Sequence, residues 1–222
     1  MSSLLLVRHG QAAFGSANYD QLTPYGEAQA SATGDFLHER QFKFARTITG
    51  PLVRQKETAR LALAPLGVSL HEEVNALNEF AEADRLLAAA EKRTGIKLVD
   101  QPDLPRSELL RHYQDQIKLW SDDAVRMEGV ETIGEFRHRV VTWFNDITGD
   151  PGPGQRLFVS TSGGVISAMF CETLGLSNKV LAETMWNIEN CSLTAITWSA
   201  HRRVIRYFNQ TAHLPQSLSS SI

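Results

Sequence analysis

Apolar and polar positions alternate along this chain with the spacing of short strands and amphipathic helices. Short apolar runs predict strands at residues 4–7, 44–49, 68–70 and 157–160. Apolar residues at helical spacing predict helices over about 24–39, 53–63, 83–93, 107–120 and 132–147, and another from about 165. Two alternating segments, 192–198 and 202–208, predict a hairpin of two further strands. We therefore expect a single α/β domain over residues 1–222, with three α/β/α layers around a mixed, mostly parallel sheet of about six strands.

The segment from about residue 80 to residue 131 does not follow the strand–helix rhythm. It has two stretches with helical spacing, joined by a connection over 95–105 that contains two prolines. We interpret this segment as a mostly helical insertion that lies over the functional site.

The first strand ends abruptly in Arg8-His9-Gly10, at the edge where open α/β sheets place their ligands. Arginine offers a planar set of donors that suits phosphate or carboxylate. Histidine is a nucleophile or base near neutral pH, and glycine lets a bound group approach the backbone closely. Taken alone, this tripeptide is equally compatible with a surface arginine and a turn histidine.

Further motifs follow in a fixed order, and together they give the chain a resemblance to a known family. They are LVRHGQA around His9, Leu22-Thr23-Pro24-Tyr25-Gly26-Glu27-Ala28-Gln29-Ala30, Pro51-Leu52-Val53-Arg54-Gln55-Lys56-Glu57-Thr58-Ala59, Leu77-Asn78-Glu79 and Thr161-Ser162-Gly163-Gly164. The chain resembles the histidine phosphatase superfamily, the phosphoglycerate-mutase-like proteins, from Leu4 to about Leu214. The second and third segments are similar to that family's "LT-x-x-G-x-x-QA" and "S-x-L-x-R-A-x-x-T-A".

The resemblance implies roles for four residues. His9 would attack phosphorus and carry the phosphoryl group, with its other ring nitrogen donating to a backbone carbonyl such as that of Gly10. Arg8 and Arg54 would neutralise the phosphate dianion, and the positive end of the helix that begins near Arg54 would face the same anion. Glu79 would protonate the leaving alkoxide and then activate water; a surface carboxylate is the alternative interpretation.

Two positions depart from the family pattern. Gly15 stands where many members have a phosphate-holding asparagine, and Asn18 could substitute only if its loop curls back. Ser162 stands where the family has a second histidine, and the Gly163-Gly164 turn after it would aim backbone N–H groups at the same edge. Replacing a charge-assisted donor with a neutral hydroxyl should cost ~1–2 kcal/mol of transition-state stabilisation and so slow the reaction.

Composition limits the other functional classes. The net charge is −3 over 222 residues, which gives no electrostatic reason for binding nucleic acid or an anionic membrane. No apolar run approaches the ~18 residues of a membrane span, and a signal peptide is not expected. Two cysteines, Cys171 and Cys191, are expected to be reduced and partly buried in a cytoplasmic protein. The seven histidines show no metal-ligand spacing, so neither a metal nor another cofactor is expected.

The function favoured by these features is metal-independent hydrolysis of a small phosphomonoester through a phosphohistidine at His9. The first alternative is a non-catalytic protein that binds phosphorylated ligands or inorganic phosphate, because Ser162 replaces the histidine. Phosphoglycerate mutase activity is the second alternative, although the chain lacks a match to the family's mutase-type segment after the acidic residue. A serine hydrolase is disfavoured because G-x-S-x-G is absent. The oligomeric state is left open between a monomer and a homodimer.

Overall fold

A six-stranded mixed sheet forms the centre of the protein in a computed structural model, which describes residues 1–13, 20–98, 101, 103–150 and 154–220. The strands are β1 (Ser2–Arg8), β2 (Arg46–Thr49), β3 (Glu72–Glu73), β4 (Arg156–Thr161), β5 (Leu193–Trp198) and β6 (Arg203–Gln210). Their order across the sheet is β3-β2-β4-β1-β5-β6. β1, β2, β3 and β4 run parallel to one another, whereas β5 is antiparallel to both β1 and β6.

β1 lies between β4 and β5 and is buried on both faces. Leu4 and Leu6 belong to one apolar core, and Leu5 and Val7 belong to a second core on the opposite face. Successive side chains of a strand point to opposite faces, so this continuous apolar run is what a strand between two helical layers requires. The expected three-layer α/β arrangement is confirmed.

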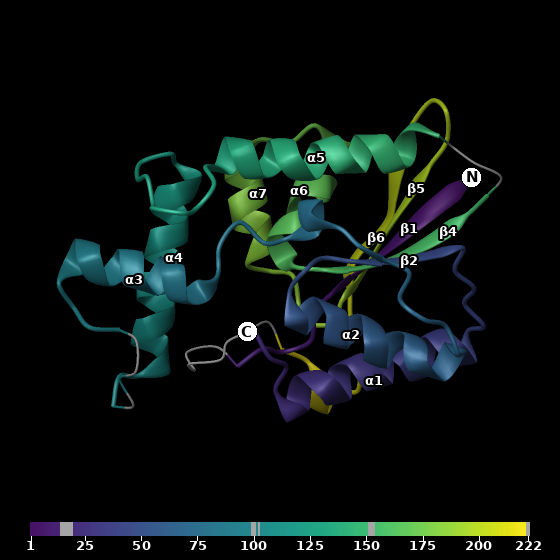
Figure 1. The fold of residues 1–222 in the computed structure, drawn as a ribbon, viewed down its shortest axis with the longest axis horizontal. Coiled ribbons are helices and arrows are strands. Elements are labelled where there is room, and N and C mark those ends of the chain that lie inside the picture. Colours follow the sequence, from purple (N-terminus) through teal and green to yellow (C-terminus); the bar gives the residue numbers. More distant parts are fainter. Residues whose placement is uncertain (14–19, 99–100, 102, 151–153, 221–222) are drawn as a thin grey trace.

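Helices cover both faces of the sheet (Figure 1). The helices are α1 (Pro24–Glu39), α2 (Val53–Leu63), α3 (Ala83–Thr94), α4 (Arg106–Ser121), α5 (Ile133–Gly149), α6 (Gly163–Leu174) and α7 (Asn178–Met185), with 3-10 turns at Ala64–Leu66, Asn75–Leu77 and Gln216–Leu218. α1 and α2 pack side by side below the sheet in Figure 1, and α5 and α6 lie above it. As expected, α1 begins at Thr23-Pro24, where the Thr23 hydroxyl caps the backbone N–H of Gly26.

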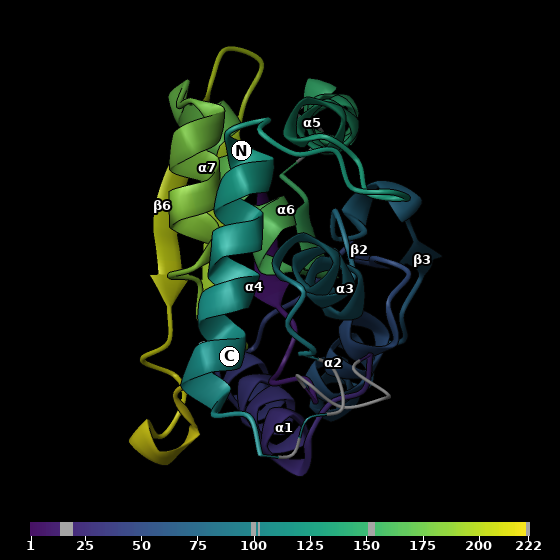
Figure 2. The same cartoon turned by 90° about the vertical axis from the view of Figure 1, so that its left-hand side faces the viewer.

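α3 and α4 lie beyond the end of the sheet toward which β1 runs, as Figure 2 shows from that side. They belong to the segment that was expected to be a helical insertion. Trp120 of α4 joins this pair to the main core: its ring stacks on Phe80 with centroids 3.9 Å apart. Its indole N–H also donates to the carbonyl of Glu131 at 2.7 Å. Because Phe80 follows Glu79 in the chain, this contact ties the insertion to one candidate site residue.

The strand predicted at residues 68–70 is wrong, because the edge strand forms later, at Glu72–Glu73. Gly67 ends the preceding turn with a left-handed φ of 65°, and the Val68 N–H bonds back to Leu63. Pairing with β2 then begins with the N–H of His71, and a two-pronged Arg46–Glu72 ion pair holds the edge. The hairpin of β5 and β6 is confirmed, while the short helix α7 was not predicted.

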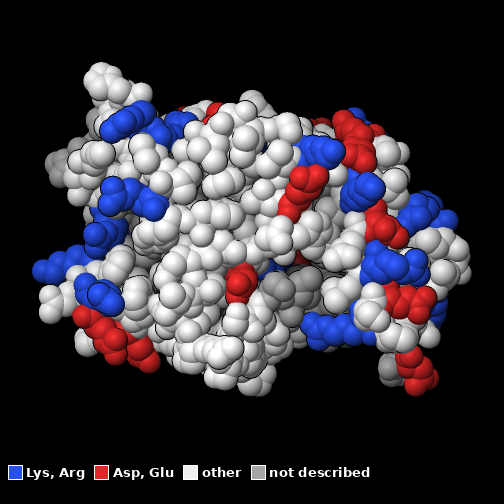
Figure 3. Space-filling view, turned by 180° about the vertical axis from the view of Figure 1, so that it is seen from behind, with Lys and Arg blue, Asp and Glu red and all other residues white. Residues whose placement is uncertain are grey.

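Charged side chains of both signs gather over the α3–α4 end in the view from behind, and the middle of that face carries few (Figure 3). Within the residues that the structure describes, no helix combines the length and apolarity needed to cross a membrane. Cys171 and Cys191 are both buried free thiols, as expected.

Candidate functional site

His9 follows the last residue of β1 and is held from three directions. Its N–H donates to the Thr161 carbonyl at 2.9 Å, which extends the pairing of β1 with β4. Its carbonyl accepts from the Asn190 amide at 3.2 Å. The ring Nδ1 lies 2.8 Å from the Gly10 carbonyl, so Nδ1 carries the hydrogen and Nε2 is left with a lone pair. This is the contact that the sequence led us to expect for a nucleophilic histidine.

Gly10 and Gly26 bring the start of α1 against the loop that carries His9. A Cβ on Gly10 would lie 2.4 Å from the backbone carbonyl oxygen of Gly26. A Cβ on Gly26 would lie 2.2 Å from the backbone carbonyl oxygen of Gln11. Only glycine permits two backbones to approach this closely. The spacing between the first two motifs therefore reflects a direct backbone contact beside His9.

The charges of two guanidinium groups, those of Arg54 and Arg8, act on the His9 ring. An Arg8 Nη1–H donates to the Ile188 carbonyl. Arg54, in the first turn of α2, is 1% exposed and forms ion pairs with Asp20 at 2.8 Å and Glu82 at 3.1 Å. Glu82 immediately precedes α3, so the second ion pair also joins the insertion to the site.

The N-terminus of α2 differs from its expected arrangement. We expected its positive end to face a bound anion together with Arg54. The Asp20 carboxylate instead accepts hydrogen bonds from the N–H groups of Val53 at 2.8 Å and Arg54 at 3.3 Å. An acidic side chain at a helix N-terminus is itself stabilising. Asp20 lies in a loop with no helical or strand pattern, so nothing in the sequence indicated this contact.

Glu79 is held by the backbone of two segments. Its Oε1 accepts from the N–H of Phe80 at 3.1 Å, and its Oε2 accepts from the N–H of Gly164 at 3.0 Å. A Cβ on Gly164 would lie 2.3 Å from Oε1. The second glycine of the Gly163-Gly164 turn is therefore required for this contact, which places Glu79 at the start of α6.

Ser162 precedes α6 and is 1% exposed. Its Oγ accepts a hydrogen bond from the side-chain amide of Gln55, with Nε2 at 2.8 Å. Sequence reasoning missed Gln55. The only signal for it was that glutamine stands where the resembled motif has alanine, directly after Arg54.

The remaining predicted site residues are placed less directly. Gly163 lies against Arg8, since its Cβ would be 3.7 Å from the Arg8 Nε, but the anchoring backbone donor is Gly164. Asn18 lies outside the described residues. Within those that are described, no three His, Cys, Asp or Glu side chains gather in a group that could hold a metal ion.

Burial and charge shift the pKa values of His9 and Glu79 in opposite directions. Burial, and then the Arg54 and Arg8 charges, hold the pKa of His9 well below its usual 6.5, although the hydrogen bond to Gly10 opposes this shift. Burial raises the pKa of Glu79, and its two backbone hydrogen bonds and the same two arginines only partly offset that effect. At neutral pH, His9 is therefore uncharged, and Glu79 binds its proton more tightly than a solvated glutamate does.

The site thus combines, in an α/β fold, an Arg-His pair at the end of β1, a second arginine and a glutamate held by backbone N–H groups. The chain belongs to the histidine phosphatase superfamily (branch 1), whose family model matches residues 4–94 and 95–211. A comparison with curated proteins finds no match.

Solved structures of phosphatases and of a mutase share this fold. A phosphoserine phosphatase from Entamoeba histolytica, in complex with phosphoserine, is similar with a TM-score of 0.68 and 16% identity, over 97% of this chain and 100% of that one. A mycobacterial glucosyl-3-phosphoglycerate phosphatase has a TM-score of 0.66 and 20% identity, over 96% of this chain and 100% of that one. A phosphoglycerate mutase from Bacillus anthracis has a TM-score of 0.65 and 19% identity, over 96% of this chain and 94% of that one. At these identities the likeness establishes the fold.

Proposed function

We propose that this protein hydrolyses a small phosphomonoester through a phosphohistidine at His9, without a metal ion. Two guanidinium groups, of Arg8 and Arg54, would neutralise the substrate dianion and the charge that develops during phosphoryl transfer. The proposal rests above all on one observation: the Gly10 carbonyl accepts the hydrogen of His9 Nδ1 and leaves the lone pair on Nε2, while burial and the Arg54 and Arg8 charges hold the pKa of His9 well below its usual value.

The reaction would proceed in two transfers. First, His9 Nε2 attacks phosphorus, an N–P bond forms, the ester P–O bond breaks, and Glu79 gives its proton to the leaving alkoxide. Second, the Glu79 carboxylate takes a proton from water, whose oxygen attacks phosphorus and breaks the N–P bond. The products are an alcohol and inorganic phosphate, and both His9 and Glu79 regain their starting states. The raised pKa of Glu79 supports its role as the acid in the first step.

Phosphate release from a panel of small phosphomonoesters, measured with EDTA present, tests this function. The wild type should turn over, His9→Ala should be inactive, and Glu79→Gln should lose 100-fold or more in kcat. Two surface residues give matched controls, since His71 and Glu73 are exposed and lie at or beside the edge strand. His71→Ala and Glu73→Gln should retain wild-type rates.

Trapping the intermediate provides a second, independent readout. After a brief reaction with a radiolabelled ester, the wild type should carry an acid-labile, alkali-stable phosphoryl group that His9→Ala lacks. An active wild type whose His9→Ala variant is equally active would refute the phosphohistidine mechanism.

The second candidate is a protein that binds phosphorylated ligands without hydrolysing them, and one observation favours it. Ser162 replaces the second histidine and contributes no charge, so the site has one fewer cation for the transition state. Micromolar binding of inorganic phosphate to a wild type that hydrolyses no ester in the panel would support this candidate over the enzyme.

A further inference from the structure

Gln55 is a fully buried polar side chain whose amide hydrogens both have acceptors and whose amide oxygen has a donor. Its Oε1 accepts from the N–H of Leu52 at 3.2 Å. Its Nε2 donates to the Leu77 carbonyl at 3.1 Å and to Ser162 Oγ at 2.8 Å. A flipped amide would turn its oxygen toward the Leu77 carbonyl and its nitrogen toward the Leu52 N–H, so two contacts would become repulsive. The amide orientation is therefore fixed by its neighbours.

This orientation determines what the Ser162 hydroxyl can do. A hydroxyl has one hydrogen to donate and lone pairs to accept, and Ser162 already accepts from Gln55. Within the described residues its own hydrogen has no acceptor. The residues after Ser162 border the site, because Gly163 lies against Arg8 and Gly164 binds Glu79.

We propose that Gln55 is a positioning residue that makes Ser162 a hydrogen-bond donor to the bound phosphate. The Gln55–Ser162 pair would then do, with a neutral donor, what the resembled family does with its second histidine. This inference rests on the proposed function of the site as a phosphate site.

The sizes of the two side chains support their pairing. Relative to the resembled motifs, Gln55 is large where alanine stands, and Ser162 is small where histidine stands. Gly50 makes room for the longer side chain, since a Cβ there would lie 2.1 Å from Gln55 Oε1. The two departures from the family pattern are thus in direct contact and compensate for each other in volume.

Gln55→Glu tests the direction of the hydrogen bond with almost no change in shape. A carboxylate cannot donate, so Ser162 would turn its hydrogen toward it and away from phosphate. We expect kcat to fall 10- to 100-fold, about as far as in Ser162→Ala. The double variant Gln55→Glu/Ser162→Ala should fall no further, because both changes remove the same donor. Toward acid pH, protonation of the introduced carboxyl should recover part of the rate in Gln55→Glu but not in the double variant.

Gln29 provides a matched control in the neighbouring helix. It is also fully buried, and its amide likewise accepts one backbone N–H and donates to a carbonyl and to a serine hydroxyl. Gln29→Glu should lower thermal stability comparably, yet keep kcat within about threefold of wild type without the acid-side recovery. Losses in Gln55→Glu and Ser162→Ala that multiply in the double variant would overturn the proposal, as would a less than threefold effect of Ser162→Ala.

Calorimetric titration with inorganic phosphate separates this inference from the proposed function. If the wild type hydrolyses nothing but binds phosphate, and both single variants weaken that binding tenfold without further loss in the double variant, the enzyme proposal fails and the positioning role stands. If the wild type is active and Gln55→Glu equals wild type in both kcat and phosphate affinity, the positioning role fails alone. A wild type that neither hydrolyses esters nor binds phosphate refutes both.

Discussion

Replacing Arg54 with methionine should weaken catalysis more than it weakens the fold. Arg54 is 1% exposed, and its ion-pair partners Asp20 and Glu82 retain 30% and 32% exposure. Removing one partner of a fully buried pair costs ~3–5 kcal/mol. Here the two carboxylates can regain water, and the methionine also avoids the desolvation of a charge. We therefore expect the free energy of unfolding to fall by about 1–2 kcal/mol.

The effect on activity comes from a different interaction. A charge-assisted hydrogen bond from a guanidinium to phosphate contributes about 2–3 kcal/mol, so Arg54→Met should lower kcat/KM about 30- to 150-fold. The Arg54 charge also lowers the pKa of both His9 and Glu79. Without it both pKa values rise, so the acid limb set by His9 and the alkaline limb set by Glu79 should both move to higher pH.

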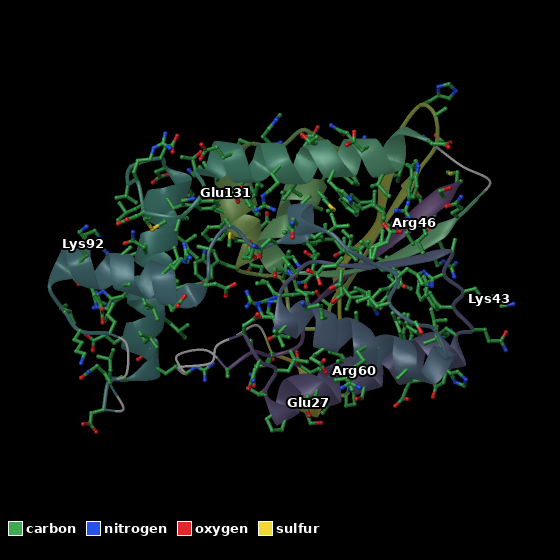
Figure 4. The ribbon with its side chains drawn as sticks, in the orientation of Figure 1. Glu27, Lys43, Arg46, Arg60, Lys92 and Glu131 are labelled. Atoms are coloured by element: carbon green, nitrogen blue, oxygen red, sulfur yellow. The ribbon has the colours of Figure 1, made fainter. Side chains whose placement is uncertain are left out.

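Urea unfolding and the pH profile of kcat/KM measure the two effects separately. Arg60 of α2, labelled in Figure 4, gives the control, because its pair with Glu57 is exposed, with side chains 63% and 42% accessible. Arg60→Met should change stability by less than about 0.5 kcal/mol and leave the pH profile unchanged. An Arg54→Met enzyme with kcat/KM within threefold of wild type, or with limbs displaced toward acid pH, would contradict this reasoning.

Three further predictions concern the surroundings of the site. Burial lowers the pKa of His213 to about 4. The unfolded chain therefore binds this proton first as the pH falls, and the free energy of unfolding should drop by at most ~3 kcal/mol between pH 6.5 and pH 4. In urea unfolding, His213→Gln should show a smaller drop over the same pH range. Trp120→Phe removes the N–H that donates to the Glu131 carbonyl, and should lower the free energy of unfolding in urea by ~1–3 kcal/mol. A decrease below about 0.5 kcal/mol would count against that hydrogen bond. Burial raises the pKa of Cys191 to about 12, so Ellman's reagent should label it only after denaturation, and rapid labelling of the native protein would contradict this.

Local patterns predicted most of the fold because each acts within a few residues. The run from Leu4 to Val7 is apolar at every position, which indicated a strand buried on both faces. Thr132 was expected to open a helix, and it does so with a capping box. The Thr132 hydroxyl accepts from the Glu135 N–H, and the Glu135 carboxylate accepts from the Thr132 N–H. Both signals depend on neighbouring residues alone, so no knowledge of the tertiary structure was needed.

The parts of the site that sequence reasoning missed are contacts between distant segments. Asp20 reaches the start of α2 across 33 residues, and Gln55 reaches Ser162 across 107. Neither contact leaves a periodic signal, because each partner occupies an irregular loop or a helix end. The edge strand at Glu72–Glu73 was missed for a related reason: it is polar, and an ion pair with β2 helps to hold it in place.

Glycines mark other long-range contacts in the sequence, although the sequence did not predict which segments they bring together. Gly10 against Gly26, and Gly164 against Glu79, are approaches that a Cβ would prevent. Replacing any of these glycines with a larger residue would be costly, so each of them stands in a motif that can be recognised. Gly50 makes the same kind of room for Gln55, but it stands where the resembled motif has serine, so the motif did not indicate a glycine contact there. The departure at Ser162 could therefore be seen in the sequence, whereas the residue that contacts it emerged only from the fold.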